Sequence, residues 1–125
     1  MDKNYRNNLT QEEKLILLDG KTETPFSGDY NDFNKQGSYV CKLCNIKLFE
    51  SKYKFNSNCG WPSFDDAIKG SIIKKRDVSL GRIRTEIICS NCKGHLGHVF
   101  EGEYYTEKNT RYCVNSLSLK FIPKL

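Results

Sequence analysis

Two Cys-x-x-Cys pairs constrain the fold of this chain more than any other feature. The pairs are Cys41/Cys44 and Cys89/Cys92, and 44 residues (positions 45–88) separate them. A Cys-x-x-Cys turn holds two thiolates at the spacing that one tetrahedral ion requires, and two such turns complete a four-sulfur shell that suits Zn²⁺. The long gap exceeds that of a compact zinc finger, so we expect two hairpins brought together by the fold. Because a four-cysteine shell leaves no coordination position open, the predicted metal is structural.

The size and charge of the chain limit the other possibilities. With 125 residues, 38% of them hydrophobic, the chain suits one domain with a single core, and we predict that residues 1–125 form it. The net charge of +5 is mild, and residues 74–76 form the only notable basic run. This pattern favours a solvated surface over a dedicated nucleic-acid face.

The cysteines and the termini indicate a compartment. Residues 1–8 are polar and contain no apolar segment of signal-peptide length, and no apolar run approaches the ~20 residues of a membrane helix. Six cysteines could form a secreted disulfide scaffold, or a Cys-x-x-Cys pair could be redox-active, but the two matched pairs favour metal. We therefore expect a soluble, cytoplasmic protein, monomeric and without a membrane partner.

Local patterns predict a mainly β fold with one short helix. Thr10 and Glu13 fit a capping box, apolar residues follow, and Gly20 is a plausible stop, so a helix is expected over about 11–19. Residues 22–37 carry the composition of a loop. Antiparallel strands are expected over 38–40, 47–49, 81–89, 96–100 and 111–121, with a helical turn over 64–68.

The segment 111–119 carries the chemistry of a nucleophile. In a strand, Arg111, Cys113 and Asn115 share one face, while Tyr112 and Val114 pack on the other. A guanidinium favours the thiolate form of a neighbouring cysteine, and an amide can orient a polar oxygen. A free cysteine is also a common core residue, so these residues alone leave a reactive Cys113 and a merely buried one equally open.

Two further segments stand out. Cys59 precedes the lone Trp61, which either plugs the core or forms a rigid wall for a small apolar group. In a straight strand, His95 and His98 would face opposite ways, but Gly97 between them permits a bulge or kink that could turn both rings to one site. His95 lies three residues after Cys92 and could ligate a metal, although a four-cysteine shell does not need it.

Taken together, the motifs resemble the signature blocks of methionine-R-sulfoxide reductases of the B type. They match in content and order, from about residue 22 to residue 121. The blocks are Cys41-x-x-Cys44, Lys54-Phe55-x-Ser57-x-Cys59-Gly60-Trp61-Pro62-Ser63-Phe64, Cys89-x-x-Cys92, Gly94-His95-Leu96-Gly97-His98-Val99-Phe100 and Arg111-Tyr112-Cys113-Val114-Asn115-Ser116.

This resemblance implies two antiparallel sheets and reduction of the R epimer of methionine sulfoxide, generally in oxidised proteins. Cys113 matches the nucleophile, which becomes a sulfenic acid, and Cys59 matches the resolving cysteine of many relatives. A Cys59–Cys113 disulfide recycled by thioredoxin is then implied.

The resemblance also assigns the residues around the substrate. His98, with His95 beside it, would supply the acid at the sulfoxide oxygen, Arg111 and Asn115 would flank the attacking sulfur, and Trp61 would pack on the substrate methyl group. Many relatives carry Pro-Asp-Gly where residues 101–103 read Glu-Gly-Glu. An acidic group there could orient Arg111, and both glutamates remain candidates.

Two other functions remain possible at this point. A zinc ribbon that binds nucleic acid would use the four cysteines and the positive charge, but it has no need of the Cys59/Cys113 pair. A cysteine hydrolase could use Cys113 and His98, but it gives Cys59 no role. A requirement for a thiol reductant distinguishes the reductase from the hydrolase.

Overall fold

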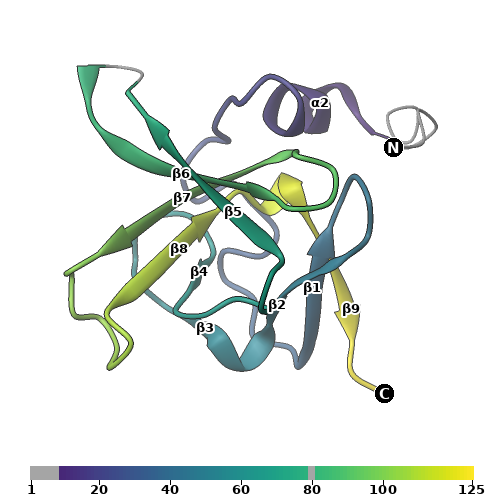
Figure 1. The fold of residues 1–125 in the computed structure, drawn as a ribbon. Coiled ribbons are helices and arrows are strands. Elements are labelled where there is room, and N and C mark those ends of the chain that lie inside the picture. The colour runs from purple at the N-terminus through teal and green to yellow at the C-terminus, as the bar shows by residue number, and fades with distance from the viewer. Residues whose placement is uncertain (1–8, 79–80) are drawn as a thin grey trace.

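The computed structural model describes residues 9–78 and 81–125, so the polar segment 1–8 lies outside the described residues. Within this part, the chain forms one α-helix, two short 3₁₀ helices and nine strands (Figure 1). They are α2 (Gln11–Leu17), β1 (Gly37–Cys41), β2 (Lys47–Glu50), η1 (Ser51–Tyr53), β3 (Lys54–Phe55), β4 (Ser63–Phe64), β5 (Ile72–Asp77), β6 (Arg84–Cys89), β7 (His95–Glu101), β8 (Thr110–Val114), η3 (Ser116–Ser118) and β9 (Leu119–Pro123).

The strands form two antiparallel sheets, as predicted. One has three strands in the order β2-β1-β9, and the other has six in the order β3-β4-β8-β7-β6-β5. The core between them is aromatic: Tyr39 and Phe49 of the small sheet meet Phe64 of the large sheet, and all three are fully buried. Phe49 stacks on Phe64 with ring centroids 4.3 Å apart, and Tyr39 meets Phe64 edge-on at 5.1 Å.

The predicted helix is present and ends two residues early, at Leu17. The capping box forms: the Glu13 amide donates to Thr10 Oγ1 (3.1 Å), and the Thr10 amide donates to Glu13 Oε1 (2.8 Å). Ile16 and Leu17 are buried, and the helix packs against β7 and η3 at the top of the molecule in Figure 1. The helix thus covers the end of the sheet that carries the histidine segment.

One secondary-structure prediction was wrong, and two strands have bounds that differ from those predicted. The helical turn over 64–68 is absent, because Ser63 and Phe64 form β4 and pair with Cys113 and Tyr112 of β8. The strand expected over 81–89 starts only at Arg84 and pairs with β5. Strand β5 itself was not predicted, because its three consecutive basic residues do not follow the alternating pattern of a strand. The strand expected over 111–121 breaks into β8 and β9, with η3 between them. No helix of the described residues is long and apolar enough to cross a membrane.

Candidate active site and metal cluster

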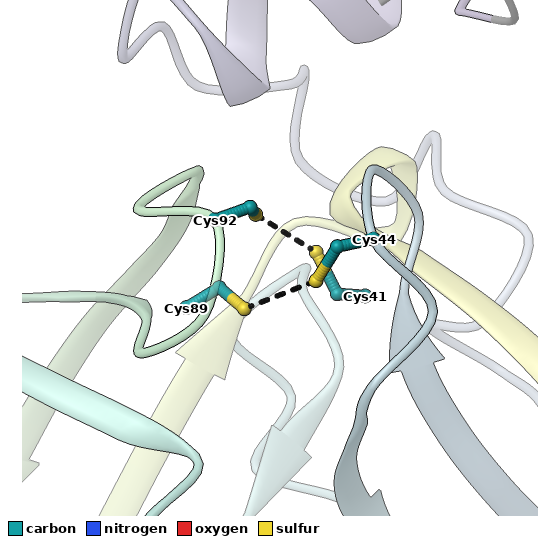
Figure 2. A group of neighbouring side chains, drawn as sticks. All are labelled: Cys41, Cys44, Cys89 and Cys92. Atoms are coloured by element: carbon teal, nitrogen blue, oxygen red, sulfur yellow. Dashed lines mark hydrogen bonds between the residues drawn. The ribbon is translucent and has the colours of Figure 1, made fainter. Parts of the chain in front are cut away.

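The four cysteines of the two Cys-x-x-Cys pairs meet in one buried cluster (Figure 2). All four Sγ atoms lie within 4.8 Å of one another, with 3.5 Å between Cys41 and Cys92 and 3.6 Å between Cys44 and Cys89. A tetrahedral Zn²⁺ with sulfur ligands at ~2.3 Å requires sulfur–sulfur distances of roughly 3.8 Å. The cluster therefore has the ligand type, number and spacing of a structural four-cysteine metal site.

The two cysteine turns have the same local geometry. The Asn45 amide donates to Cys41 O (2.8 Å), and the Lys93 amide donates to Cys89 O (2.9 Å). Asn45 and Lys93, each directly after the second cysteine of its pair, have left-handed φ values of 68° and 66°. One turn closes the β1–β2 hairpin of the small sheet and the other closes the β6–β7 hairpin of the large sheet. A metal bound here would fasten the two sheets together.

The second cysteine pair lies in the large sheet and in the loop before β4. On β8, Cys113 is paired in register with His98 of β7 and with Ser63 of β4. Gly97 permits the β7–β8 approach, because a Cβ there would lie 1.9 Å from the carbonyl oxygen of Cys113. Any side chain at this position would push the histidine strand away from the cysteine strand.

Cys59 reaches the same place from the loop between β3 and β4. Its Sγ lies 4.0 Å from Cys113 Sγ and 3.6 Å from Ser63 Oγ, and it donates to Trp61 O at 3.5 Å. Ser63 Oγ also contacts Ser57 Oγ at 2.7 Å, so a small polar network holds the loop in place. To form a disulfide of ~2.05 Å, the two sulfurs would have to approach each other by about 2 Å.

The proximity of the two thiols sets their ionisation. The hydrogen bond from Cys113 lowers the pKa of Cys59 to about 4, and the same interaction, together with burial, raises the pKa of Cys113. Arg111 acts in the opposite direction on the pKa of Cys113, as its place in the sequence suggested, but more weakly than Cys59 does. The pair therefore carries one shared negative charge at neutral pH, and a second ionisation is opposed by the first.

This coupling predicts an unusual pH profile for alkylation. The rate of an ordinary thiol, pKa about 8.5, falls about tenfold per pH unit below that value. We expect iodoacetamide to alkylate the Cys59/Cys113 pair at a nearly constant rate down to about pH 5, as followed by peptide mass spectrometry with glutathione as the internal control. In Cys59→Ser, the remaining thiol should lose this low-pH reactivity. Equal pH profiles for the wild type and glutathione would contradict the shared charge.

Glu103 is the acidic residue that holds Arg111. The Glu103 carboxylate accepts from Arg111 Nε (2.8 Å) and Nη2 (3.2 Å), a two-point contact that fixes the plane of the guanidinium. The Phe100 ring covers the same group, with its centroid 4.5 Å from Arg111 Cζ. Glu101 instead pairs with Lys74 at 3.7 Å. The sequence left both glutamates open, because the choice depends on the path of the loop after β7.

The structure contains a bulge of the kind that Gly97 permits. The β6–β7 register shifts between Ile87 and Ile88, where residues 95–97 oppose only these two residues. As a result, the His95 and His98 rings lie 5.6 Å apart, edge to face.

Each histidine has its own carboxylate, which the sequence analysis missed. His95 Nδ1 lies 2.6 Å from Glu86 Oε2, and His98 Nε2 lies 2.8 Å from Asp77 Oδ2. Burial lowers the pKa of His98, although Asp77 partly opposes this effect. Strand register alone brings Glu86 and Asp77 here, so no spacing along the chain could have identified them.

Asn115 and Trp61 are linked through the backbone of Glu23. The Glu23 amide donates to Asn115 Oδ1 (3.0 Å), and Trp61 Nε1 donates to Glu23 O (3.1 Å). Asn115 Nδ2 also donates to Leu96 O (3.1 Å), so the amide is held in the fold at the end of β8. The Glu23 side chain is buried, its Oε1 accepts from the Leu117 amide (2.9 Å), and burial raises its pKa.

Six of the seven residues predicted for the reaction line one cavity of about 520 Å³. His95 is the exception: it is buried and lies behind His98. The complete lining is Thr22, Cys59, Trp61, Arg82, Ile83, Arg84, Gly97, His98, Phe100, Arg111, Cys113, Val114 and Asn115. Two adjacent thiols in a pocket with an aromatic wall, a histidine and a fixed guanidinium suit thiol redox chemistry on a small polar group.

Comparison with known proteins assigns the class. The SelR domain family model matches residues 9–123. Proteins named peptide methionine sulfoxide reductase MsrB are 46% identical in Bradyrhizobium diazoefficiens (98% of this chain, 88% of that protein) and 49% identical in Teredinibacter turnerae (96% and 89%). Peptide methionine sulfoxide reductase B3 of Arabidopsis thaliana is 48% identical (98% and 69%). The chain belongs to the MsrB family of peptide methionine sulfoxide reductases, which are oxidoreductases.

A solved structure supports the fold alone. The Mis18 'Yippee-like' domain superimposes with a TM-score of 0.59 over 72% of this chain and 98% of that one, at 17% identity. The family assignment favours the reductase over the nucleic-acid ribbon and the cysteine hydrolase considered from the sequence.

Proposed function

We propose that this protein reduces the R epimer of methionine sulfoxide, mainly in oxidised proteins, with Cys113 as nucleophile and Cys59 as resolving cysteine. The observation that carries the proposal is the Cys59–Cys113 pair, with 4.0 Å between its sulfurs, facing a cavity that Trp61 and His98 also line. Two thiols can supply both electrons that a sulfoxide requires and end as a disulfide, without a redox cofactor.

The reaction balances in three steps. With the one proton of the pair on Cys59, the Cys113 thiolate attacks the sulfoxide sulfur, the oxygen takes up a proton, and transfer of the oxygen to Cys113 gives methionine and a sulfenic acid. The Cys59 thiol then attacks the Cys113 sulfur, which forms the disulfide and releases water. A dithiol reductant, which we propose is thioredoxin, restores both thiols by exchange and is itself oxidised to a disulfide.

His98 is our candidate for the proton donor at the sulfoxide oxygen. It lies opposite Cys113 in the register of the two strands and lines the cavity, while Asp77 fixes its ring through Nε2. Because its pKa is lowered, the protonated ring is a stronger acid than an ordinary imidazolium. His95 and its partner Glu86 would support His98 from behind.

Arg111, Asn115 and Trp61 would hold the reacting groups. Cys59 and burial raise the pKa of Cys113, and Arg111 opposes this rise, so Arg111 would favour the attacking thiolate once the substrate separates the two thiols. Trp61 is fixed by its bond to Glu23 O and would receive the substrate methyl group on its ring. With the methyl on the indole and the oxygen toward His98, only one epimer presents its sulfur to Cys113.

The four-cysteine cluster would have a structural role. Cys41, Cys44, Cys89 and Cys92 would bind a structural Zn²⁺ that fastens the sheets and takes no part in the reaction. Residues 1–125 would act as one reductase domain, as a monomer and in the cytoplasm, where thioredoxin-type reductants keep free thiols reduced.

The test is turnover of separated R and S epimers of a blocked methionine sulfoxide, with thioredoxin or a small dithiol as reductant. We expect turnover of the R epimer only, because the cavity positions the methyl and oxygen groups differently. Equal turnover of both epimers would contradict the role given to Trp61. No turnover of either epimer by folded, zinc-loaded protein would overturn the proposed function.

A further inference from the structure

The lining of the active-site cavity has an asymmetric charge. Arg82, Arg84 and Arg111 belong to it, and no aspartate or glutamate does. Arg82 precedes β6, Arg84 is the first residue of β6, and Arg111 is the second residue of β8. A cavity lined by charges of one sign attracts ligands of the opposite sign.

Two of these three arginines already have carboxylate partners behind the cavity wall. Arg111 is held at two points by Glu103, and Arg84 Nη2 lies 3.4 Å from Asp77 Oδ2. The shared thiolate charge lies next to Arg111 at the base of the cavity. These contacts offset the positive charges of Arg84 and Arg111.

Arg82 differs from both. It is exposed, and it forms no ion pair with any residue in the described parts of the chain. Its neighbour Ile83 also lines the cavity and is 70% exposed, so the two residues form an open edge with one cationic and one aliphatic side chain. Arg82 is therefore the cation at this edge that is available to a ligand.

In a protein substrate, the residues next to methionine sulfoxide lie near the mouth of the cavity, and Arg82 and Ile83 form one exposed edge of it. Consecutive Cα atoms are 3.8 Å apart, so flanking side chains remain close to the mouth while the sulfoxide lies against the thiols. We propose that Arg82 makes the enzyme favour methionine sulfoxide with an aspartate or glutamate one or two positions away. This proposal rests on the proposed function and adds a preference in substrate sequence.

The expected effect is modest and appears in binding. An exposed ion pair changes an equilibrium by about two- to fivefold, and salt weakens it. Because Arg82 would contact the flanking residue equally in the ground state and the transition state, the difference should appear in KM with little change in kcat.

The test compares three blocked peptides that contain R-methionine sulfoxide and differ only in having glutamate, glutamine or lysine as its neighbours. For the wild type we expect KM to rise from the glutamate to the glutamine to the lysine peptide, with a total range of about two- to fivefold that shrinks at high salt. Arg82→Glu should reverse this order. The matched control is Arg76→Glu, which changes the net charge equally at an exposed β5 position outside the cavity and should keep the wild-type order.

The outcomes separate the two proposals. An identical order in the wild type and Arg82→Glu, or a wild-type preference for the lysine peptide, would overturn the role of Arg82 and leave the reductase function intact. Reversal by Arg76→Glu as well would also overturn it, because the effect would then come from the overall charge. If the wild type reduces none of the three peptides, the proposed function itself fails.

Discussion

Replacing Cys113 with serine is expected to lower turnover of R-methionine sulfoxide by at least about 10⁴-fold, because a hydroxyl at this pH is a far weaker nucleophile than a thiolate. The substitution changes one atom at a position between β4 and β7, so the fold should remain intact. Near-UV circular dichroism and bound zinc would confirm this. Turnover within tenfold of the wild type would mean that another residue attacks the sulfoxide.

Cys59→Ser is the matched variant, because it removes the neighbouring thiol and keeps Cys113. Without reductant it should still yield one methionine per enzyme, whereas steady turnover with thioredoxin should collapse, because no disulfide can form. A small thiol that reduces the sulfenic acid directly should restore turnover.

Intact mass distinguishes the states after one turnover. The wild type should lose the mass of two hydrogens, whereas Cys59→Ser should gain the mass of one oxygen. A lasting sulfenic acid at Cys113 in the wild type, with Cys59 still reduced, would show that the two cysteines do not exchange despite the 4.0 Å between their sulfurs.

Removal of the metal is expected to unfold or loosen the whole domain. Structural zinc contributes ~10–16 kcal/mol in zinc-finger peptides, as much as or more than the ~5–15 kcal/mol total stability of a typical domain. Here the four ligands join the β1–β2 hairpin of one sheet to the β6–β7 hairpin of the other. Loss of the metal would leave four buried thiols within 4.8 Å and free the two sheets to separate.

Elemental analysis should find about one zinc per chain, and a strong chelator should lower the thermal midpoint and reduce the far-UV circular dichroism. Cys92→Ser should lose both zinc and cooperative unfolding, whereas Cys59→Ser, outside the cluster, should keep both. Activity should disappear together with the zinc, because β7 begins three residues after Cys92 and carries both histidines. Protein without zinc that is insensitive to the chelator would contradict a structural metal.

Some residues of the candidate site could be identified from the sequence, and others could not. The residues that match the family blocks are contiguous or closely spaced, so Cys113, Cys59 and the histidine segment can be found by reading along the chain. Glu103 could not be distinguished from Glu101, because the path of the chain at the end of β7 decides which carboxylate faces Arg111. Arg82 carried no signal in the sequence, because its importance comes from the cavity that it borders.

Features that depend on local chemistry could be predicted from the sequence alone. These are the capped helix from Gln11, the two cysteine turns and the bulge at Gly97, since each rests on hydrogen bonds or spacing within a few residues. Features that depend on pairing between distant strands could be identified only in the folded structure. Strand register places Asp77 and Glu86 against the histidines. The proximity of the two thiols lowers the pKa of Cys59 and raises the pKa of Cys113, so the pair carries one negative charge. Electrostatic coupling acts over a few ångströms of space, and only the folded chain sets those distances.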